Sequence, residues 1–593
     1  MKKLRHTEDF LASTNLHKLK RAKTAHPLLQ LTGIGKLETL VGSLTPNEGL
    51  DFVNALFDQM EIEIVFDPQE LQRIPKKGPF ITISNHPFGA IDGLILLKLL
   101  APLRSDYKII ASFFLQHLKP IHSHLIFPQT PNQIPKAPKK QVLNKEGYTQ
   151  ALAHLDQGMG LGLFPAGEVS TLQPGKRQIT DQGWERQTLK LIQKAAVPIV
   201  PIYFQGSNSA IFHLLGMVNP KLSTAMLPAE LFRKKQKAIR VRIGNRILSR
   251  EVSQFKDLDQ FGRFLRAKTY ALGSALEVRK FYKPKRRPKL RRAKAPQAII
   301  DPIPKESIKA ELESLRSHNL LFTQQNFEVF NAYSTEIPHI LQELGRLREI
   351  TFREVGEGTN EPLDTDEFDL YYYHLFIWDK EEEAIVGAYR IGKGDEILEK
   401  FGKKGFYTHS LFRIDDGFLP ILSQAIELGR SFILKSYQQK RLPLFLLWKG
   451  IVYFLKQHPE SRYIIGPVSI SNSYTTVSRS FIVAFIEKYY FDQELAAYIT
   501  PRHAFRMKKR EPVDTQTLLK GAGADLKKID KIVSDIEPSH MPLPILLKKY
   551  ISQNARIIGF NVDPKFNDAL DGLMIVDIME LPETSVYHQE DGK

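Results

Sequence analysis

Apolar positions in the first half of the chain recur in two alternating patterns. Residues 50–60 place their apolar side chains at the three- and four-residue spacing of a helix that buries one face. Short apolar runs typical of buried strands follow at residues 79–84, 107–112, 160–164, 198–203 and 239–243, and helical patterns lie between them at residues 93–104, 146–157 and 183–196. This alternation of strands and helices predicts an α/β domain over residues 1–278.

The pattern changes in the second half of the chain. Strand-like runs lie at residues 370–378, 384–391, 463–468 and 572–579, and helical patterns lie at residues 337–349, 418–436 and 443–457. We therefore expect an α+β domain over residues 301–593. Residues 279–300 are polybasic and contain several prolines, so they are predicted to form a linker rather than part of a core.

Composition narrows the class of protein. The chain has 593 residues, of which 42% are hydrophobic and 25% are charged, a balance typical of globular proteins of several domains. The absence of cysteine excludes disulfides, thiolate zinc sites, iron–sulfur clusters and a cysteine nucleophile. The best apolar run, residues 94–103, is too short to cross a bilayer, and the N-terminus lacks the apolar core of a signal peptide. We therefore expect a cytoplasmic protein.

The net charge of +18 is concentrated in two segments. Residues 279–294 hold ten Lys and Arg residues and no acid, and residues 1–23 add a net +5, so these segments carry 15 of the 18 charges. Basic residues bind anionic membranes with about 1 kcal/mol each. Nucleic-acid binding would need more stacking aromatics than Phe281 and Tyr282 provide. We expect peripheral attachment to the inner face of the cytoplasmic membrane and no nucleic-acid partner; a solvated linker is the alternative.

A histidine and an aspartate follow the first predicted strand. Residues 84–93 read SNHPFGAIDG, and the proline and glycines favour a tight turn that brings Asp92 back onto the ring of His86. A carboxylate on one imidazole nitrogen fixes the tautomer and leaves the other nitrogen to take a proton from a hydroxyl. A loop histidine that only caps the next helix is the structural alternative.

Two later segments extend this pattern. Residues 164–170 read FPAGEVS directly after a predicted strand, and residues 197–201 read VPIVP at the start of another. The three segments, in this order, resemble the motifs of the glycerolipid (lysophospholipid) acyltransferase family, and the resemblance extends over residues 50–250. The first domain is therefore expected to have the α/β fold of that family.

The resemblance implies direct acyl transfer at His86. In that family the histidine, oriented by the aspartate that matches Asp92, deprotonates an acceptor hydroxyl, which attacks an acyl thioester without a covalent acyl-enzyme. Asn85, Gly167 and Glu168 would line the substrate site.

Some residues depart from the family pattern. His86 and Asp92 are separated by five residues instead of four, and Ala166 stands where the family usually has Glu. Val169 replaces the usual Arg. Because the family's usual acceptors bear a phosphate, the loss of this Arg favours a different hydroxyl acceptor.

Acidic residues cluster in the second half of the chain. The cluster, just before the strand-like run of residues 370–378, comprises Asp364, Asp366, Glu367 and Asp369. Clustered carboxylates can hold an amine or a metal ion, and a solvated loop is the alternative. Glu427 and Arg430 lie three residues apart in the helix predicted at residues 418–436, where they would share one face and could form an ion pair.

These features together resemble the N-acyltransferases of amino-acid lipid synthesis, relatives of the acyl-homoserine-lactone synthases with a GNAT-like fold. The matching segments are Arg348 with Phe352, residues 364–369, His374 with Leu375, residues 386–390, residues 427–433 and residues 546–577. The residues that the resemblance places at the substrate are Arg348, Asp366, Asp369, Arg390, Glu427 and Arg430. Chiefly Asp366 and Asp369 would hold the amine of an amino acid and deprotonate it.

The acyl donor is expected to be an acyl carrier protein. Residues 392–396 follow the strand at residues 384–391 but are too short and acidic for a glycine-rich loop that cradles the pyrophosphate of CoA. Acyl-CoA is the alternative donor, and an acidic carrier would need a basic docking surface. No bound cofactor and no metal site are expected, since His117, His122 and His124 have no partnering acid.

Both halves together resemble the bifunctional acyltransferases that build ornithine or glycine lipids. In that interpretation the C-terminal domain transfers a 3-hydroxyacyl group to the α-amine of an amino acid, and the N-terminal domain esterifies the 3-hydroxyl of this lyso-lipid. The amino acid stays open among glycine, ornithine, lysine and serine. One alternative is a phospholipid-type acyltransferase whose second half only recruits the carrier. Another is a lipid- or carrier-binding protein without activity, against which the intact His86 and Asp92 argue.

Overall fold

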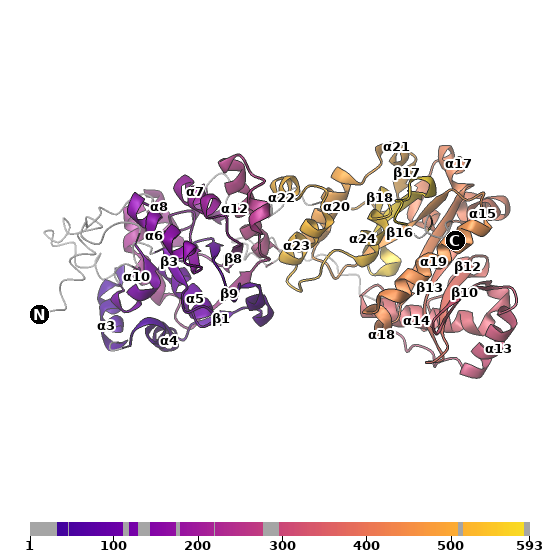
Figure 1. Cartoon of the computed structure of the whole chain (residues 1–593), viewed down its shortest axis with the longest axis horizontal. Helices are drawn as coiled ribbons and strands as arrows, with labels where there is room; N and C mark the ends of the chain where they lie inside the picture. The colour runs from indigo at the N-terminus through magenta and orange to yellow at the C-terminus, as the bar shows by residue number, and fades with distance from the viewer. Residues whose placement is uncertain are drawn as a thin grey trace, which may run out of the picture. The chain divides into compact units, whose positions relative to one another are not determined.

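The computed structural model divides the chain into two compact units (Figure 1). It describes residues 32–44, 47–110, 115, 118–127, 143–173, 178–218, 220–274, 276, 296–507, 514–585 and 587. Both basic segments, most of the expected linker and His117 lie outside these residues. Unit 1 comprises residues 1–278 and 511–540, and unit 2 comprises residues 279–510 and 541–593. Among the described residues no helix combines the length and the hydropathy needed to span a membrane.

A seven-stranded sheet with the order β1-β9-β8-β2-β5-β3-β4 forms the centre of unit 1. Its strands are β1 (Glu63–Val65), β2 (Phe80–Ser84), β3 (Lys108–Ile110), β4 (Leu125–Ile126), β5 (Gly160–Leu163), β8 (Ile199–Gln205) and β9 (Ala238–Ile243). All neighbours pair in parallel except β8 and β9. The predicted α/β architecture of the first domain is confirmed.

Helices cover both faces of this sheet. One face packs against α3 (Ile34–Leu44), α4 (Gly49–Met60) and α5 (Ala90–Leu100), and the other against α6 (Lys145–Asp156), α7 (Arg186–Ala195) and α12 (Leu258–Ser274). Shorter elements are the hairpin of β6 (Thr171–Gln173) and β7 (Gln178–Thr180), and helices α8 (Ala210–Val218), α9 (Pro220–Ala225) and α10 (Leu227–Phe232). Because α5 follows β2 directly, residues 85–89 lie at the carboxyl end of a central strand, where open α/β sheets bind ligands.

Two helices from late in the sequence complete unit 1. Helices α22 (Thr515–Ala522) and α23 (Leu526–Ile536) pack against α12. The fully buried carboxylate of Asp535 accepts a hydrogen bond from Lys268 Nζ at 2.7 Å and another from the backbone N–H of Asn245 at 2.8 Å. The expected span of 301–593 for the second domain therefore needs correction, since this buried ion pair and the apolar face of α23 join residues 511–540 to the first domain.

An eight-stranded mixed sheet with the order β10-β11-β12-β13-β15-β16-β19-β18 forms the centre of unit 2. Its strands are β10 (Leu320–Gln324), β11 (Phe327–Tyr333), β12 (Tyr373–Asp379), β13 (Ala384–Lys393), β15 (Ala425–Ile433), β16 (Tyr463–Ile470), β18 (Arg556–Asp563) and β19 (Ala569–Asp577). All neighbours are antiparallel except β15 and β16. The predicted α+β class of the second domain is confirmed.

Helices on both sides of this sheet supply the core. Helices α13 (Lys305–Leu315) and α14 (Pro338–Glu354) share a cluster of buried side chains with β11, β12 and β13. Helix α19 (Arg441–Gln457) packs on the opposite face of the sheet, where its Gly450 lies against Leu375 and Val329. Further helices are α15 (Gly394–Phe401), α20 (Thr476–Tyr489) and α24 (Ile545–Ile551).

The helix predicted at residues 418–436 is wrong over most of its length. A short helix, α17 (Leu419–Leu422), is followed by strand β15. Residues 425–428 are buried one after another because β15 lies inside the sheet with both faces covered. Such a strand has no two-residue alternation of burial, so the apolar positions among residues 425–433 are easily read as one face of a helix.

Strands β15 and β16 pair over only a short stretch. The parallel ladder joins Ala425–Glu427 to Tyr463–Ile465. Beyond it β15 continues to Ile433, and β16 continues to Ile470 while it pairs with β19 on its other side. Within the described sheet, the two strands form no further ladder with each other. Their facing edges therefore have backbone groups that an extended ligand can pair with.

Candidate active sites

The predicted contact between His86 and Asp92 is present in unit 1. Nδ1 of His86 lies 2.9 Å from Oδ2 of Asp92, and both side chains are buried. The same oxygen accepts the backbone N–H groups of Phe88 and Gly89 at 3.0 Å each. Gly89 has φ of 91°, a conformation that favours glycine, and it begins helix α5. The turn thus holds the carboxylate rigidly, and the carboxylate orients the imidazole.

The electrostatics of this pair favour a base at His86. Burial raises the pKa of Asp92, while the contact with His86 opposes this rise. Because Nδ1 faces the carboxylate, Nε2 is the ring nitrogen that can accept a proton. The ring also packs on Phe164, with 4.3 Å between the ring centroids. A buried imidazole held between a carboxylate and an aromatic ring can act as a general base for a hydroxyl.

The turn after β5 lies beside the His86 turn. The N–H of Ser170 donates to the backbone oxygen of His86 at 2.8 Å. Gly167, with φ of 66°, and the partly exposed Glu168 belong to the same turn. The structure therefore brings two of the segments that were recognised in the sequence to one place.

Asn85 occupies a structural position between two strands. Its Nδ2 donates to the carbonyl of Phe204 at 3.0 Å, and its Oδ1 accepts the N–H of Phe204 at 2.8 Å. These bonds join the end of β2 to β8. Asn85 thus fixes the strand end from which the His86 turn departs.

Sequence reasoning missed Asp181. Its Oδ1 accepts the N–H of His86 at 3.2 Å and the hydroxyl of Ser170 at 2.5 Å, and its Oδ2 accepts Trp184 Nε1 at 3.3 Å. This buried carboxylate therefore ties the backbone of the catalytic turn to the turn after β5. No motif marked Asp181 in the sequence, because its role depends on contacts between distant segments.

In unit 2 the acidic cluster is bound by arginines. Arg348 Nη1 lies 2.7 Å from Asp369 Oδ1, and Arg390 Nη1 lies 3.2 Å from the same oxygen and 2.5 Å from Asp366. Arg430 pairs with Asp366 at 2.9 Å and with Asp364 at 3.1 Å. The structure thus brings together five of the predicted site residues in one buried network of alternating charge.

The network argues against Asp369 as a base. Burial opposes its ionisation, but the charges of Arg348 and Arg390 outweigh burial and hold its pKa well below the usual range. His374 lies next to this network, with Nδ1 3.4 Å from Arg348 Nη2. Burial lowers the pKa of His374 to about 4. An aspartate with so low a pKa does not take a proton from an amine near neutral pH. The network instead stabilises the packing of α14 on the sheet.

The predicted pairing of Glu427 with Arg430 on a helix is wrong. On β15 the two residues belong to a strand, and Arg430 has φ of 50° at a bulge where two residues of β15 face one residue of β13. The bulge turns Arg430 towards Asp364 and Asp366. Glu427 is buried and accepts the N–H of Thr408 at 2.6 Å, the N–H of Tyr407 at 2.9 Å and the hydroxyl of Tyr372.

A second cluster of acidic side chains lies where β15 and β16 separate. Asp571 on β19 pairs in register with Ser469 on β16, whose hydroxyl donates to Asp571 Oδ1 at 2.7 Å. Asp563 at the end of β18 accepts the hydroxyl of Tyr407 at 3.2 Å. The Arg430 guanidinium lies 4.9 Å from the centre of the Tyr407 ring. Acids, hydroxyls and a cation therefore meet on one face of the sheet.

Asp571 and the nearby Glu357 both have raised pKa values. Burial, with the charges of Asp563 and Glu357, raises the pKa of Asp571 to about 8, while Ser469 and Arg430 oppose the rise. Burial raises the pKa of Glu357 to about 7. A buried carboxylate with such a pKa is a far stronger base than an ordinary aspartate and marks a candidate catalytic site. The available sequence signal was an acidic residue within the apolar run of β19.

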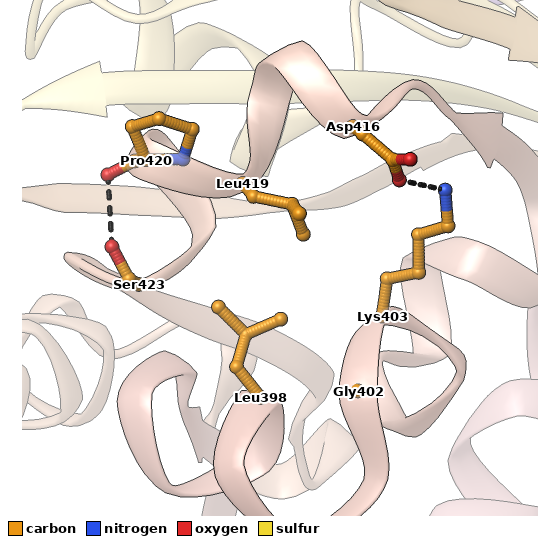
Figure 2. A pocket seen from close by; sticks show the side chains of 7 residues that line it. All are labelled: Leu398, Gly402, Lys403, Asp416, Leu419, Pro420 and Ser423. Carbon is orange, nitrogen blue, oxygen red and sulfur yellow. Dashed lines mark hydrogen bonds and ion pairs between the residues drawn. The ribbon is translucent and has the colours of Figure 1, made fainter.

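A surface hollow of unit 2 offers no such chemistry (Figure 2). It is lined by Leu398, Gly402, Lys403, Asp416, Leu419, Pro420 and Ser423. Its two charged side chains, Lys403 and Asp416, pair with each other at 2.5 Å, and the Ser423 hydroxyl donates to the carbonyl of Pro420. The hollow therefore has no free titratable group among its lining residues.

The described part of the chain contains no cluster of His, Cys, Asp and Glu side chains suited to a metal ion. His122 packs edge-on against Phe127, and His124 Nδ1 lies 3.4 Å from the carbonyl of Tyr107. The two described histidines of the predicted trio therefore serve packing and backbone contacts.

Comparisons with known proteins match each unit to a family. Residues 37–279 match the model of a family described as "Acyltransferase", and residues 347–448 match the "Acetyltransferase (GNAT) domain". A "Glycine N(alpha)-acyltransferase" of Phocaeicola vulgatus is 31% identical over 304 residues, which cover 48% of this chain and 90% of that relative. A "Lyso-glycine lipid O-acyltransferase" of Bacteroides thetaiotaomicron is 26% identical over 233 residues, 38% of this chain and 80% of that relative.

Solved structures also match the chain, among them an acyltransferase. The 1-acyl-sn-glycerophosphate (LPA) acyltransferase PlsC from Thermotoga maritima is 15% identical, with 45% of this chain and 93% of that chain covered and a TM-score of 0.24. A likeness of that degree is too weak to support an inference about the site.

Proposed function

The chain belongs to the family of the glycine N(alpha)-acyltransferases, and from that premise we propose that it makes a glycine lipid by two successive acyl transfers. It is an acyltransferase with an acyltransferase domain and a GNAT domain. Unit 2 would N-acylate glycine with a 3-hydroxyacyl group, and unit 1 would esterify the 3-hydroxyl of the product. The observation that carries this proposal is the His86–Asp92 pair, which lies within residues 37–279, the part of the chain that matches the acyltransferase family.

In the O-acyl step His86 acts as the general base. Nε2 takes the proton of the acceptor's 3-hydroxyl while its oxygen attacks the carbonyl carbon of the acyl thioester. The new ester C–O bond forms, the C–S bond breaks, and the proton passes to the leaving thiolate. Asp92 stabilises the imidazolium that forms in between, because its carboxylate lies 2.9 Å from Nδ1.

In the N-acyl step Asp571 replaces the expected Asp366 and Asp369 as the base. The amine nitrogen of glycine attacks the thioester carbonyl, the amide C–N bond forms and the C–S bond breaks. Asp571 takes the amine proton, which then passes to the thiolate. Its position supports this role, since it lies on the strand next to β16, beside the edges that β15 and β16 leave unpaired.

The donor is proposed to be an acyl carrier protein. The segment that joins β15 to α19 carries the exposed Lys435 and also Lys440, whose ammonium lies over the ring of Tyr437. A basic segment next to the separated strands suits an acidic carrier that delivers its thioester there. Comparing the rates with an acyl carrier protein and with CoA as carriers of the same acyl group tests this choice.

We propose that the two basic segments attach the chain to the inner face of the cytoplasmic membrane, because each basic residue is attracted to anionic lipid. Both substrates of the O-acyl step have long acyl chains, and a product of this kind stays in the membrane. Co-sedimentation with vesicles of anionic and of neutral lipid tests the attachment.

Purified full-length chain tests the proposed function. We expect glycine and 3-hydroxyacyl carrier protein to give N-(3-hydroxyacyl)glycine, and a second acyl donor to convert it into the diacylated lipid. Mass spectrometry identifies both products. Formation of acylated glycerophosphate instead would contradict the proposal.

A further inference from the structure

A buried lysine that pairs with no carboxylate among the described residues lies beside the catalytic turn of unit 1. Lys234 follows helix α10, and only 8% of it is exposed. Within the described residues its ammonium makes one hydrogen bond, to the carbonyl of Ser207 at 2.8 Å, and it lies 4.4 Å from the centre of the Phe88 ring. Buried lysines are rare unless an anion pairs with them.

The nearby carboxylates have other partners. Glu230 accepts the N–H and the hydroxyl of Ser209, at 2.9 and 2.5 Å, and lies 3.7 Å from Arg233. Asp92 is held by His86 and the backbone of the catalytic turn. The charges of Glu230 and Asp92 raise the pKa of Lys234, but burial outweighs them and lowers it to about 8. The ammonium therefore stays mostly charged near neutral pH, and no described carboxylate forms an ion pair with it.

A second buried group faces the same turn. Asn208, which is 4% exposed, donates from Nδ2 to the carbonyl of Phe88 at 3.4 Å, and its Oδ1 has no partner among the described residues. A buried acceptor without a donor is uncommon and points to a missing ligand group. Phe88 thus contacts both side chains, and it stands two residues after His86.

We propose that Lys234 and Asn208 bind the head group of the O-acyl acceptor, an N-acyl amino acid, with Lys234 on its free carboxylate and Asn208 Oδ1 on its amide N–H. This inference rests on the proposed function, which makes such a lyso-lipid the acceptor. Only six covalent bonds separate the carboxylate carbon of N-(3-hydroxyacyl)glycine from its 3-hydroxyl oxygen, a span of at most roughly 8 Å. The head group can therefore lie next to Phe88 while the hydroxyl reaches His86.

Apolar side chains also border the turn. Val169 and Leu227 lie over Gly89, so closely that a β-carbon on Gly89 would come within 3.4 Å of Val169 and 2.8 Å of Leu227.

The test measures O-acylation of two acceptors by the full-length enzyme. One is N-(3-hydroxyacyl)glycine, and the other is its carboxamide, which has the same shape without the charge. We expect the wild type to prefer the carboxylate by about 100-fold in kcat/KM, the effect of one charge-assisted contact in a buried site. Lys234→Met should reduce this preference to about 1, Lys234→Arg should keep much of it, and Asn208→Ala should slow both acceptors alike.

Lys235→Met is the matched control. Lys235 is the next residue, its side chain is 51% exposed, and its removal takes away the same charge without touching the turn. An unchanged preference in Lys235→Met supports the proposal. Equal use of both acceptors by the wild type overturns this inference while the proposed function stands. This comparison uses the wild type alone and so does not depend on whether the variants fold. A preference that Lys234→Met leaves intact also overturns it, whereas a wild type that esterifies neither acceptor overturns both.

Discussion

Asp92 Oδ2 lies 2.9 Å from Nδ1 of His86 and at the same time accepts two backbone N–H groups of the turn between them. The carboxylate therefore serves both the local fold and the orientation of the imidazole. Asp92→Asn keeps the shape but places an amide against Nδ1, which favours the wrong tautomer. We expect O-acylation to fall by about 10²–10⁴-fold.

The readout for Asp92→Asn is the ratio of the two activities of the chain. N-acylation of glycine should persist at the rate of the wild type, since it takes place in unit 2. A variant that loses both activities together would indicate unfolding, and one that retains full O-acylation would remove Asp92 from the mechanism.

Asp571→Asn should abolish N-acylation, because an amide cannot take the proton of the amine. In the wild type the pKa of Asp571 is about 8. Below that pH the side chain is protonated and inactive as a base, so kcat for N-acylation should rise with pH and level off above about 8. A kcat that stays constant from pH 6 to about 9 would argue against Asp571 as the base.

The same substitution should increase stability in alkaline solution. The folded-state pKa of Asp571 lies above that of an unfolded aspartate, near 3.9. As the pH rises from about 4 to about 8, ionisation of this side chain stabilises the unfolded chain but not the folded one. The free energy of unfolding therefore falls over that range. Asp571→Asn removes this loss, and we expect about 1–3 kcal/mol more stability at pH 8 and little change near pH 4, measured by denaturant unfolding.

Asp369→Asn should have the opposite effect on stability. It leaves the buried guanidinium groups of Arg348 and Arg390 without a compensating charge, which costs about 3–5 kcal/mol. The pKa of Asp369 is held well below normal in the folded state, so its contribution is present above about pH 4 and is lost as the pH falls further. A stable Asp369→Asn variant with a specific loss of glycine binding would restore this residue to the amine site.

Much of the fold and of one site could be predicted from the sequence. The His86 turn is a local feature, since a strand, a tight turn and a helix N-terminus bring Asp92 to the ring within seven residues. The proposed amine site around Asp571 could not be predicted in the same way. Asp571, Ser469 and Tyr407 meet only because β19 pairs with β16 and β18 carries Asp563 to the same face.

Local reasoning also failed where the strand is buried on both faces. Burial does not alternate along residues 425–433, and at the bulge the Arg430 side chain contacts Tyr407, whose backbone N–H donates to Glu427. Three residues of the acidic cluster pair with arginines that come from α14, β13 and β15, so their structural role appears only in the folded chain.

Asp535→Ala should destabilise unit 1, although it lies among residues that were expected in the second domain. The substitution leaves the buried ammonium of Lys268 without its partner at 2.7 Å. We expect a loss of about 3 kcal/mol in unfolding free energy and a reduced O-acylation at elevated temperature. Unchanged thermal inactivation of O-acylation would mean that α23 does not support the first domain.

The most direct test of the account is lipid analysis of a host that expresses this chain alone. The wild type should produce glycine carrying an amide-linked 3-hydroxyacyl chain with a second acyl chain esterified to it. His86→Ala should produce only the monoacylated N-acylglycine, because its base for the second transfer is gone. Diacylated glycine lipid from His86→Ala, or the absence of any glycine lipid from the wild type, would contradict the account.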